Sequence, residues 1–219
     1  MPDILSIASF TVAMALLATL VMLPPGVAVA WLLARRRFPG RVVLETVVSL
    51  PLVLPPVATG LILITLLGRR GPLGAWLERV GLEIMFTWRA VVVAMAVMGF
   101  PLLVRAARAG FEQVDRRYEQ IAATLGAGPA RVFFTISLPL ARRGVLAGAL
   151  LGFSRALGEF GATILLAGAL PSTRTIAVAI YTYTETGQTA AAMATLAVSA
   201  TIAFGALLLS NHLSMSTGQ

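Results

Sequence analysis

Two opposite charges stand inside an otherwise apolar part of the sequence. Arg155 and Glu159 lie four residues apart in the stretch GFSRALGEFGATI, a spacing that places them on one face of a helix. If Arg143 marks the membrane boundary, Arg155 lies about 18 Å farther along the helix axis, near the middle of a bilayer whose hydrocarbon core is about 30 Å thick. A charge at that depth on a lone helix costs roughly 2.5–3.5 kcal/mol, so we expect both side chains to face protein or an internal cavity.

Two interpretations of this pair stay open. In the first, Arg155 and Glu159 form a structural ion pair that locks their helix to a neighbouring helix. In the second, they lie beside the path of a transported solute or beside its gate, together with Ser154 and Thr163 from the same stretch.

The residues that most catalytic chemistry requires are scarce in this chain. Its 219 residues include no cysteine, a single histidine and 17 basic residues that are all arginine. Thiolate nucleophiles, the P-loop lysine, Schiff-base lysines and sites with several histidine ligands are therefore excluded. A hydrolase built on Ser154 would lack a base, because His212 lies at the far end of the last apolar run and is better explained as an interfacial residue. We expect a protein that is not an enzyme, with no catalytic residue and no metal site.

The composition is typical of a polytopic membrane protein. Hydrophobic residues make up 58% of the chain and charged residues only 12%, whereas a soluble domain carries about 25% charged residues. The net charge of +8 does not indicate nucleic acid, because the arginines cluster between apolar runs without interleaved aromatic residues. No cleavable signal peptide is expected, since the first ten residues lack a basic segment.

Five apolar runs predict an all-α fold with about five transmembrane helices. Their approximate bounds are 7–33, 47–67, 90–105, 144–170 and 190–209. The first run would form about 40 Å of helix, more than a bilayer requires, and Pro24 and Pro25 are expected to kink or divide it. Residues 176–183 are too few to span and form either a short external helix or a re-entrant piece.

The second run contains the segment LPLVLPP, which does not suit a simple lipid-facing span. A proline inside a helix removes one backbone hydrogen bond and bends the helix. Irregular backbone at membrane depth is tolerated only where it is buried in protein or lines a cavity. Pro55 and Pro56 are therefore candidates for the translocation path or its gate, and the alternative is a kinked span with a structural role only.

The distribution of arginine predicts the orientation. One side of the five-span arrangement carries eleven arginines, at positions 35, 36, 37, 41, 105, 108, 116, 117, 131, 142 and 143. The other side carries five, at positions 69, 70, 79, 89 and 174. Because cytoplasmic loops are enriched in arginine and lysine, we expect the N-terminus outside and the C-terminus in the cytoplasm.

The longest interruption between apolar runs, residues 114–140, has the pattern of two short helices joined by a glycine elbow. One face of the first helix would consist of Val114, Tyr118, Ile121, Ala122 and Leu125. Gly126 and Gly128 can turn the chain out of that helix, and Pro129 suits the first turn of the next. A second amphipathic piece follows, and Pro139 is expected to end it. Such an element is either a docking surface or a hairpin that lies on the bilayer.

The spacing in this segment resembles the cytoplasmic coupling signature of membrane subunits of ATP-binding-cassette (ABC) importers. That signature reads Glu-Ala-Ala, three residues, Gly, nine residues, Ile-x-Leu-Pro, and in that family the loop sits in a groove on the ATPase subunit. Here Gln120, Ile121 and Ala122 replace Glu-Ala-Ala, and the acid stands one position earlier, at Glu119. The resemblance implies ATPase-coupling roles for Glu119, Gln120, Ala122, Ala123, Gly126, Ile136, Leu138 and Pro139.

Three segments together extend the resemblance over nearly the whole chain. LPLVLPP, TLGAGPARVFFTISLPL and RALGEFGATI look like the permease subunits of molybdate importers and are similar to the longer membrane subunits of sulfate importers. The resemblance implies a type I ABC importer transmembrane domain over residues 7–213, with residues 114–140 as the cytoplasmic coupling loop. Molybdate is the expected substrate, and tungstate and sulfate remain alternatives because all three are tetrahedral dianions. An ATP-independent secondary transporter is less expected, since the sequence shows no inverted halves.

The resemblance also implies the partners. The chain would form a homodimer in the inner membrane of a bacterium, with two cytoplasmic ABC ATPase subunits and an external oxyanion-binding protein. ATP would bind to the partner subunit, so no cofactor is expected on this chain. Residues 68–89 and 171–188 would then face the binding protein.

Overall fold

The regular structure of the chain is entirely helical wherever the computed structural model describes it, which is the backbone of residues 4–216 and the side chains of residues 4–205 and 208. The elements in chain order are α1 (Ile4–Arg35), α2 (Arg41–Val53), α3 (Pro56–Leu67), α4 (Pro72–Arg79), α5 (Trp88–Gln113), α6 (Arg116–Thr124), α7 (Pro129–Val132), the π-helix η1 (Phe133–Ser137), α8 (Leu138–Leu157), α9 (Gly161–Ala167), α10 (Ile176–Glu185) and α11 (Thr189–Ser216). The predicted all-α fold is confirmed. The prediction for His212 concerns a side chain outside the described set.

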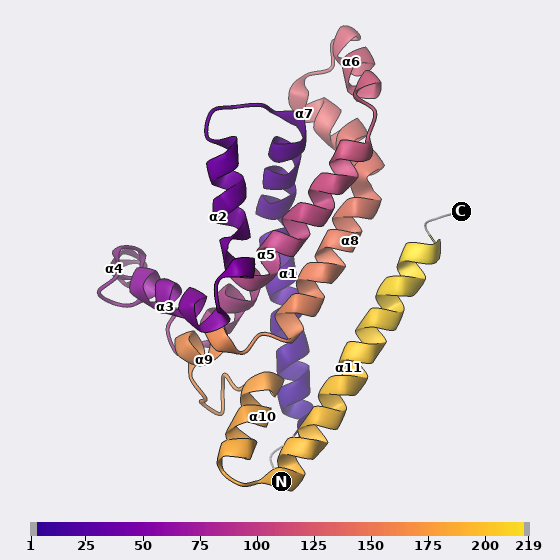
Figure 1. Cartoon of the computed structure of the whole chain (residues 1–219). Coiled ribbons are helices and arrows are strands. Elements are labelled where there is room, and N and C mark those ends of the chain that lie inside the picture. The colour runs from indigo at the N-terminus through magenta and orange to yellow at the C-terminus, as the bar shows by residue number, and fades with distance from the viewer. Residues whose placement is uncertain (1–3, 217–219) are drawn as a thin grey trace.

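Three long helices, α1, α5 and α8, pack side by side and form the centre of the molecule (Figure 1). Glycines allow α5 and α8 to approach closely, because a Cβ added to Gly144 would lie 2.5 Å from the Cα of Gly110. Small and apolar side chains fill the rest of the interface. Pro24 and Pro25 lie inside α1 and do not divide it, which leaves a kink as the remaining alternative of the prediction.

The second predicted span is a pair of helices bent by 119°. Pro51 lies inside α2, whereas Leu54 and Pro55 adopt extended backbone conformations between the two helices. Such conformations are expected before proline, because the proline ring clashes with a helical residue at the preceding position. Pro56 then begins α3.

The fourth predicted span differs from the sequence-based expectation at both ends. It begins earlier, because α7, η1 and α8 form one continuous apolar helix from Pro129 to Leu157. Pro139 therefore does not end a helix, and that prediction is wrong. The reason is the π-turn, in which the Leu138 N–H donates to the Phe133 carbonyl and Pro139 occupies the first turn of the regular α-helix that follows.

The same span also ends earlier than predicted. The chain leaves the helix after Leu157, and a separate short helix, α9, begins at Gly161. Residues 144–170 are thus a broken helix rather than one crossing. The ambiguous stretch 176–183 forms α10, which lies beside the beginning of α11 (Figure 1).

Three helices in the described part of the chain are long and apolar enough to cross a membrane: α1, α5 and the helix Pro129–Leu157. The bent pair α2–α3 is a fourth candidate. The fifth predicted crossing corresponds to α11, whose described apolar part, Thr189–Gly205, falls below the length of a full span. Length and composition therefore support three or four of the five predicted spans.

Candidate functional site

The segment between α5 and α8 forms a bent hook at one end of the helical bundle (Figure 1). Asp115 begins α6 by accepting a hydrogen bond from the Arg117 backbone N–H at 2.9 Å. Gly126, with φ of +84°, turns the chain after α6, and Pro129 begins α7. The glycine elbow thus lies where the sequence predicts it. We call residues 114–137 the hook.

The large apolar residues of α6, and Leu125 directly after it, point away from the bundle. Tyr118, Ile121 and Leu125 are 57%, 58% and 82% exposed. Val114, predicted to share their face, is instead buried in the core beneath the hook. A helix that covers a protein normally turns its apolar side inward, so this arrangement leaves an apolar face without a partner in a single chain.

The acidic residue of α6 points inward. One carboxylate oxygen of Glu119 accepts hydrogen bonds from the Arg35 Nε at 3.0 Å and from the Ser137 hydroxyl at 2.7 Å. The side chains of Arg35 and Glu119 are only 6% and 19% exposed. Arg35 also donates to the Val114 carbonyl at 2.9 Å. Sequence reasoning assigned Arg35 only to the topology signal and gave no sign of this contact.

The remaining predicted coupling residues lie in two regions, one at α6 and its glycine elbow and the other at η1 and the start of α8. Gln120 and Ala123 line a pocket of about 440 Å³ between α1, α6 and α7, which Glu119 and Ser137 also line. Ala122 is half-buried, and Gly126 is exposed at the elbow. Leu138 packs against the core beneath the hook, Ile136 is half-buried and Pro139 is exposed. The structure therefore brings the α6 residues together and places 136, 138 and 139 on the adjoining helix.

The charged pair of the fourth span lies at the break between α8 and α9. The Arg155 guanidinium approaches one oxygen of Glu159 at 2.8 Å, and the other oxygen accepts the Ala162 backbone N–H at 2.8 Å. The Glu159 side chain is 1% exposed and that of Arg155 is 25% exposed. Glu159 therefore ties the end of α8 to the first turn of α9, rather than joining α8 to a neighbouring long helix.

The break between α2 and α3 meets the break between α8 and α9. A Cβ added to Gly161 would lie 2.7 Å from the Cβ of Pro56, and one added to Gly60 would lie 2.9 Å from the Cα of Ala162. Two interrupted helices that meet inside a bundle are typical of transporter binding regions, because the interrupted backbone can line a cavity there. Pro55 lies at this junction between α2 and α3.

Two polar residues predicted to line the translocation path, Thr163 and Ser154, differ in burial and hydrogen bonding. The Thr163 hydroxyl is buried and has no hydrogen-bond partner among the described residues, and the same holds for Thr59 on α3. The Ser154 hydroxyl donates to the Leu150 carbonyl at 2.9 Å. Ser154 also lines a separate pocket of about 210 Å³ between α8 and α11. Among the described residues, no group of three or more acidic or histidine side chains could hold a metal ion.

Comparison with known families and proteins gives consistent matches. Residues 26–214 match the family described as binding-protein-dependent transport system inner membrane component. The chain is 49% identical over 201 residues to the molybdenum transport system permease protein ModB of Escherichia coli K12, covering 90% of this chain and 87% of the relative. It is 40% identical over 177 residues to ModB of Azotobacter vinelandii, covering 80% and 78%. The sulfate transport system permease protein CysT of Escherichia coli K12 is 40% identical over 143 residues, 65% of this chain and 52% of that protein.

Solved structures share the fold. The methionine ABC transporter MetNI in an inward-facing conformation matches with a TM-score of 0.73 at 16% identity, over 99% of this chain and 96% of that chain. A bacterial ABC transporter that imports alginate matches with a TM-score of 0.70 at 18% identity, over 97% and 79%. The helical arrangement is therefore that of the transmembrane subunits of these importers.

Proposed function

Because the chain belongs to the family of binding-protein-dependent transport system inner membrane components, we propose that it is the permease subunit of an ATP-driven importer of molybdate. Membership makes it a multi-pass inner-membrane transport component rather than an enzyme. The relatives named as molybdenum permeases support molybdate, since they match more of the chain than the sulfate permease does.

The outward apolar face of α6 is the single observation that carries the ATP-driven part of this proposal. Tyr118, Ile121 and Leu125 form a small apolar surface on and directly after a short helix at the end of the bundle. Two ABC ATPase subunits, one for each permease chain, would receive this face in a groove. Burial of such a face against a partner is favourable by about 25 cal/mol per Å² of apolar area.

Movement of the hook would alter the bundle as a whole. The hook is continuous with α8 through η1, and α8 ends at the junction of the two broken helices. Closure of the ATPases would displace α6 as a rigid body and rock α8, which gives alternating access to a central path. A homodimer would place that path on its two-fold axis, since so few helices do not enclose one alone.

The broken-helix junction is the proposed gate. Arg155 presents a partly exposed guanidinium, whose N–H groups can donate hydrogen bonds to oxyanion oxygens, and Glu159 holds that guanidinium in place. Pro55, Pro56 and Thr163 lie on the two interrupted segments, and Ser154 lies on the adjoining face of α8. Displacement of α8 relative to α3 would open or close this junction.

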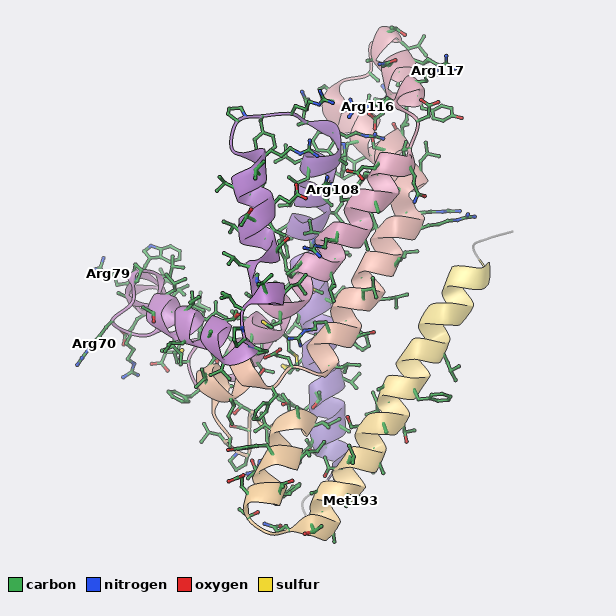
Figure 2. All side chains as sticks on the ribbon, in the orientation of Figure 1. Arg70, Arg79, Arg108, Arg116, Arg117 and Met193 are labelled. Carbon is green, nitrogen blue, oxygen red and sulfur yellow. The ribbon has the colours of Figure 1, made fainter. Side chains whose placement is uncertain are left out.

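The proposed orientation places the hook in the cytoplasm. The arginine-rich connection between α1 and α2 lies at the same end of the molecule as the hook, and the starts of α1 and α11 lie at the other (Figures 1 and 2). The N-terminus would thus be outside and the C-terminus inside. Residues 68–89 and 171–188 would form the outer surface that meets an oxyanion-binding protein.

Uptake into proteoliposomes tests this function. The chain is reconstituted with its ATPase and binding protein, and labelled molybdate, tungstate and sulfate are supplied in separate arms. We expect ATP-dependent accumulation of molybdate, with sulfate accumulated at least 10-fold more slowly. Faster sulfate uptake would assign the chain to sulfate import, equal tungstate uptake would widen the substrate to both metal oxyanions, and accumulation without ATP would contradict the importer.

A further inference from the structure

We propose that Arg35 is a positioning residue for coupled transport, because it fastens α6 to α1 and thereby passes the movement of α6 to the opposite end of the molecule. The inference rests on the proposed function, in which an ATPase moves α6. Arg35, Glu119 and Ser137 together are called the coupling clamp. The clamp joins α6 and η1, which lie close together in the sequence, to the distant helix α1.

The clamp is a charged contact with little access to water. Arg35 reaches Glu119 through Nε and the Val114 carbonyl through Nη2, so a single guanidinium holds both α6 and the end of α5. The planar guanidinium of arginine can donate to two acceptors in fixed directions, whereas the lysine ammonium sits on a flexible stem and fixes no such geometry. Because water is largely excluded, the attraction is screened much less than that of a surface ion pair.

Apart from its chain connections to α5 and α7, little else holds α6 to the bundle. No residue of α6 is buried, and its apolar side faces outward. Among the described residues, its side-chain hydrogen bonds to α1 and η1 are those of Glu119 and a longer one from Arg116 to the Ala34 carbonyl at 3.3 Å. A force applied to the outer face of α6 would therefore pass to α1 chiefly through Glu119 and Arg35.

The far end of α1 is fixed to a different element. The Thr11 hydroxyl, which is fully buried, accepts the Ile176 backbone N–H at 2.9 Å and so holds the first residue of α10. The helix rises about 36 Å without interruption between Thr11 and Arg35. Figure 1 shows α1 extending from the region of α10 to the region of the hook. One helix thus connects the docking surface to the segment proposed to meet the binding protein.

Neutral replacements separate coupling from folding. Removal of one partner leaves the other as a buried, unpaired charge, whereas replacement of both by neutral groups of similar size often preserves the fold. The variants are therefore Arg35→Met, Glu119→Gln and the double variant R35M/E119Q. Arg37→Met is the matched control, because Arg37 is an exposed arginine in the loop just beyond α1.

The readout is molybdate transported per ATP hydrolysed in proteoliposomes, together with co-purification of the ATPase. We expect R35M/E119Q to retain the ATPase and to hydrolyse ATP, with the ratio of transport to hydrolysis lowered at least 10-fold. We also expect binding protein to lose its stimulation of hydrolysis, since α1 no longer links the two surfaces. R37M should behave as the unmodified complex does.

Two results would overturn the inference. One is an unchanged ratio in R35M/E119Q, which would show that α6 acts through η1 and α8 alone. The other is loss of the ATPase from the complex in step with loss of uptake, which would make the clamp a structural support of the docking surface. If the unmodified complex itself fails to couple ATP to uptake, the proposed function fails, and that outcome is distinct from a failure confined to the clamp variants.

Discussion

At the residue scale, the chain contains two glutamates that make the same combination of contacts. Glu119 and Glu159 each pair with an arginine and each also accept a hydrogen bond from a neutral donor, the Ser137 hydroxyl or the Ala162 backbone N–H. Glu119 joins α6 to α1 and η1, and Glu159 joins the end of α8 to the first turn of α9. The buried Glu159 and the largely buried Glu119 are tolerated because each carboxylate has a cationic partner and a hydrogen-bond donor.

Arg155→Ala should abolish uptake while the ATPase remains bound. The substitution leaves the Glu159 carboxylate buried and unpaired, so we also expect a loss of stability of about 3 kcal/mol. Glu159→Gln should destabilise less, because a glutamine oxygen still accepts the Ala162 N–H and Arg155 is partly exposed to water. Uptake assays, co-purification and thermal unfolding check these outcomes, and wild-type uptake by the Arg155 variant would remove this residue from the path.

At the element scale, the sequence predicts positions better than it predicts continuity. The hook, its glycine elbow and the cores of α1 and α5 lie where hydrophobic runs and turn residues place them. The break after Leu157 is missed, because the apolar run continues without a proline and the Glu159 cap is a contact that only the folded chain forms. Pro139 is predicted to end a helix, but the helix continues through it. The π-turn at η1 accommodates a residue that ordinarily ends a helix.

The partners of the site residues could not be predicted from spacing alone. Glu119 is recognised as part of the hook, but its contact with Arg35 joins residues 84 positions apart. Pro56 and Gly161, which pack against each other, lie even farther apart in the sequence. Local patterns predict helices and turns, whereas such pairs depend on how the helices pack.

Gly161→Ala tests the close contact between α9 and α3. The added Cβ would lie 2.7 Å from the Pro56 Cβ and 3.0 Å from the Val57 backbone nitrogen, so the two segments must separate. We expect a destabilisation of about 1–3 kcal/mol and a clear loss of uptake. Gly158→Ala is the matched control, since its Cβ would meet nothing within 4 Å. Equal thermal unfolding and uptake of the two variants would contradict a close-packed junction.

Ile121→Asp tests the docking face of α6. The side chain is exposed, so the substitution should change the stability of the permease alone by no more than about 0.5 kcal/mol. In the complex it would place a carboxylate against an apolar groove, and we expect the ATPase to be lost on purification. Val80→Asp, an equally apolar-to-charged change at an exposed position beyond α4, should retain the ATPase. Retention by both variants would place the docking surface elsewhere.

At the scale of the whole molecule, α1 and α8 connect the two ends of the bundle. α8 leads from the hook to the junction of broken helices, and α1 leads from the coupling clamp to α10. Figure 2 shows labelled arginines in both regions: Arg116 and Arg117 lie on the hook, and Arg70 and Arg79 lie near α4. Through α1 and α8, one movement of the hook would reach both the proposed gate and the proposed outer surface.

The most direct test of the account is the cross-linking of the hook in native membranes. The chain contains no cysteine, so Leu125→Cys introduces one thiol directly after α6, at the most exposed of the three apolar residues Tyr118, Ile121 and Leu125, without background from this subunit. We predict that it reacts with a membrane-impermeant maleimide only from the cytoplasmic side and forms a cross-linked product with the ATPase subunit. Reaction from the outside, or the absence of any cross-link to the ATPase in the assembled complex, would contradict the claim that this hook transmits the ATPase movement into the membrane.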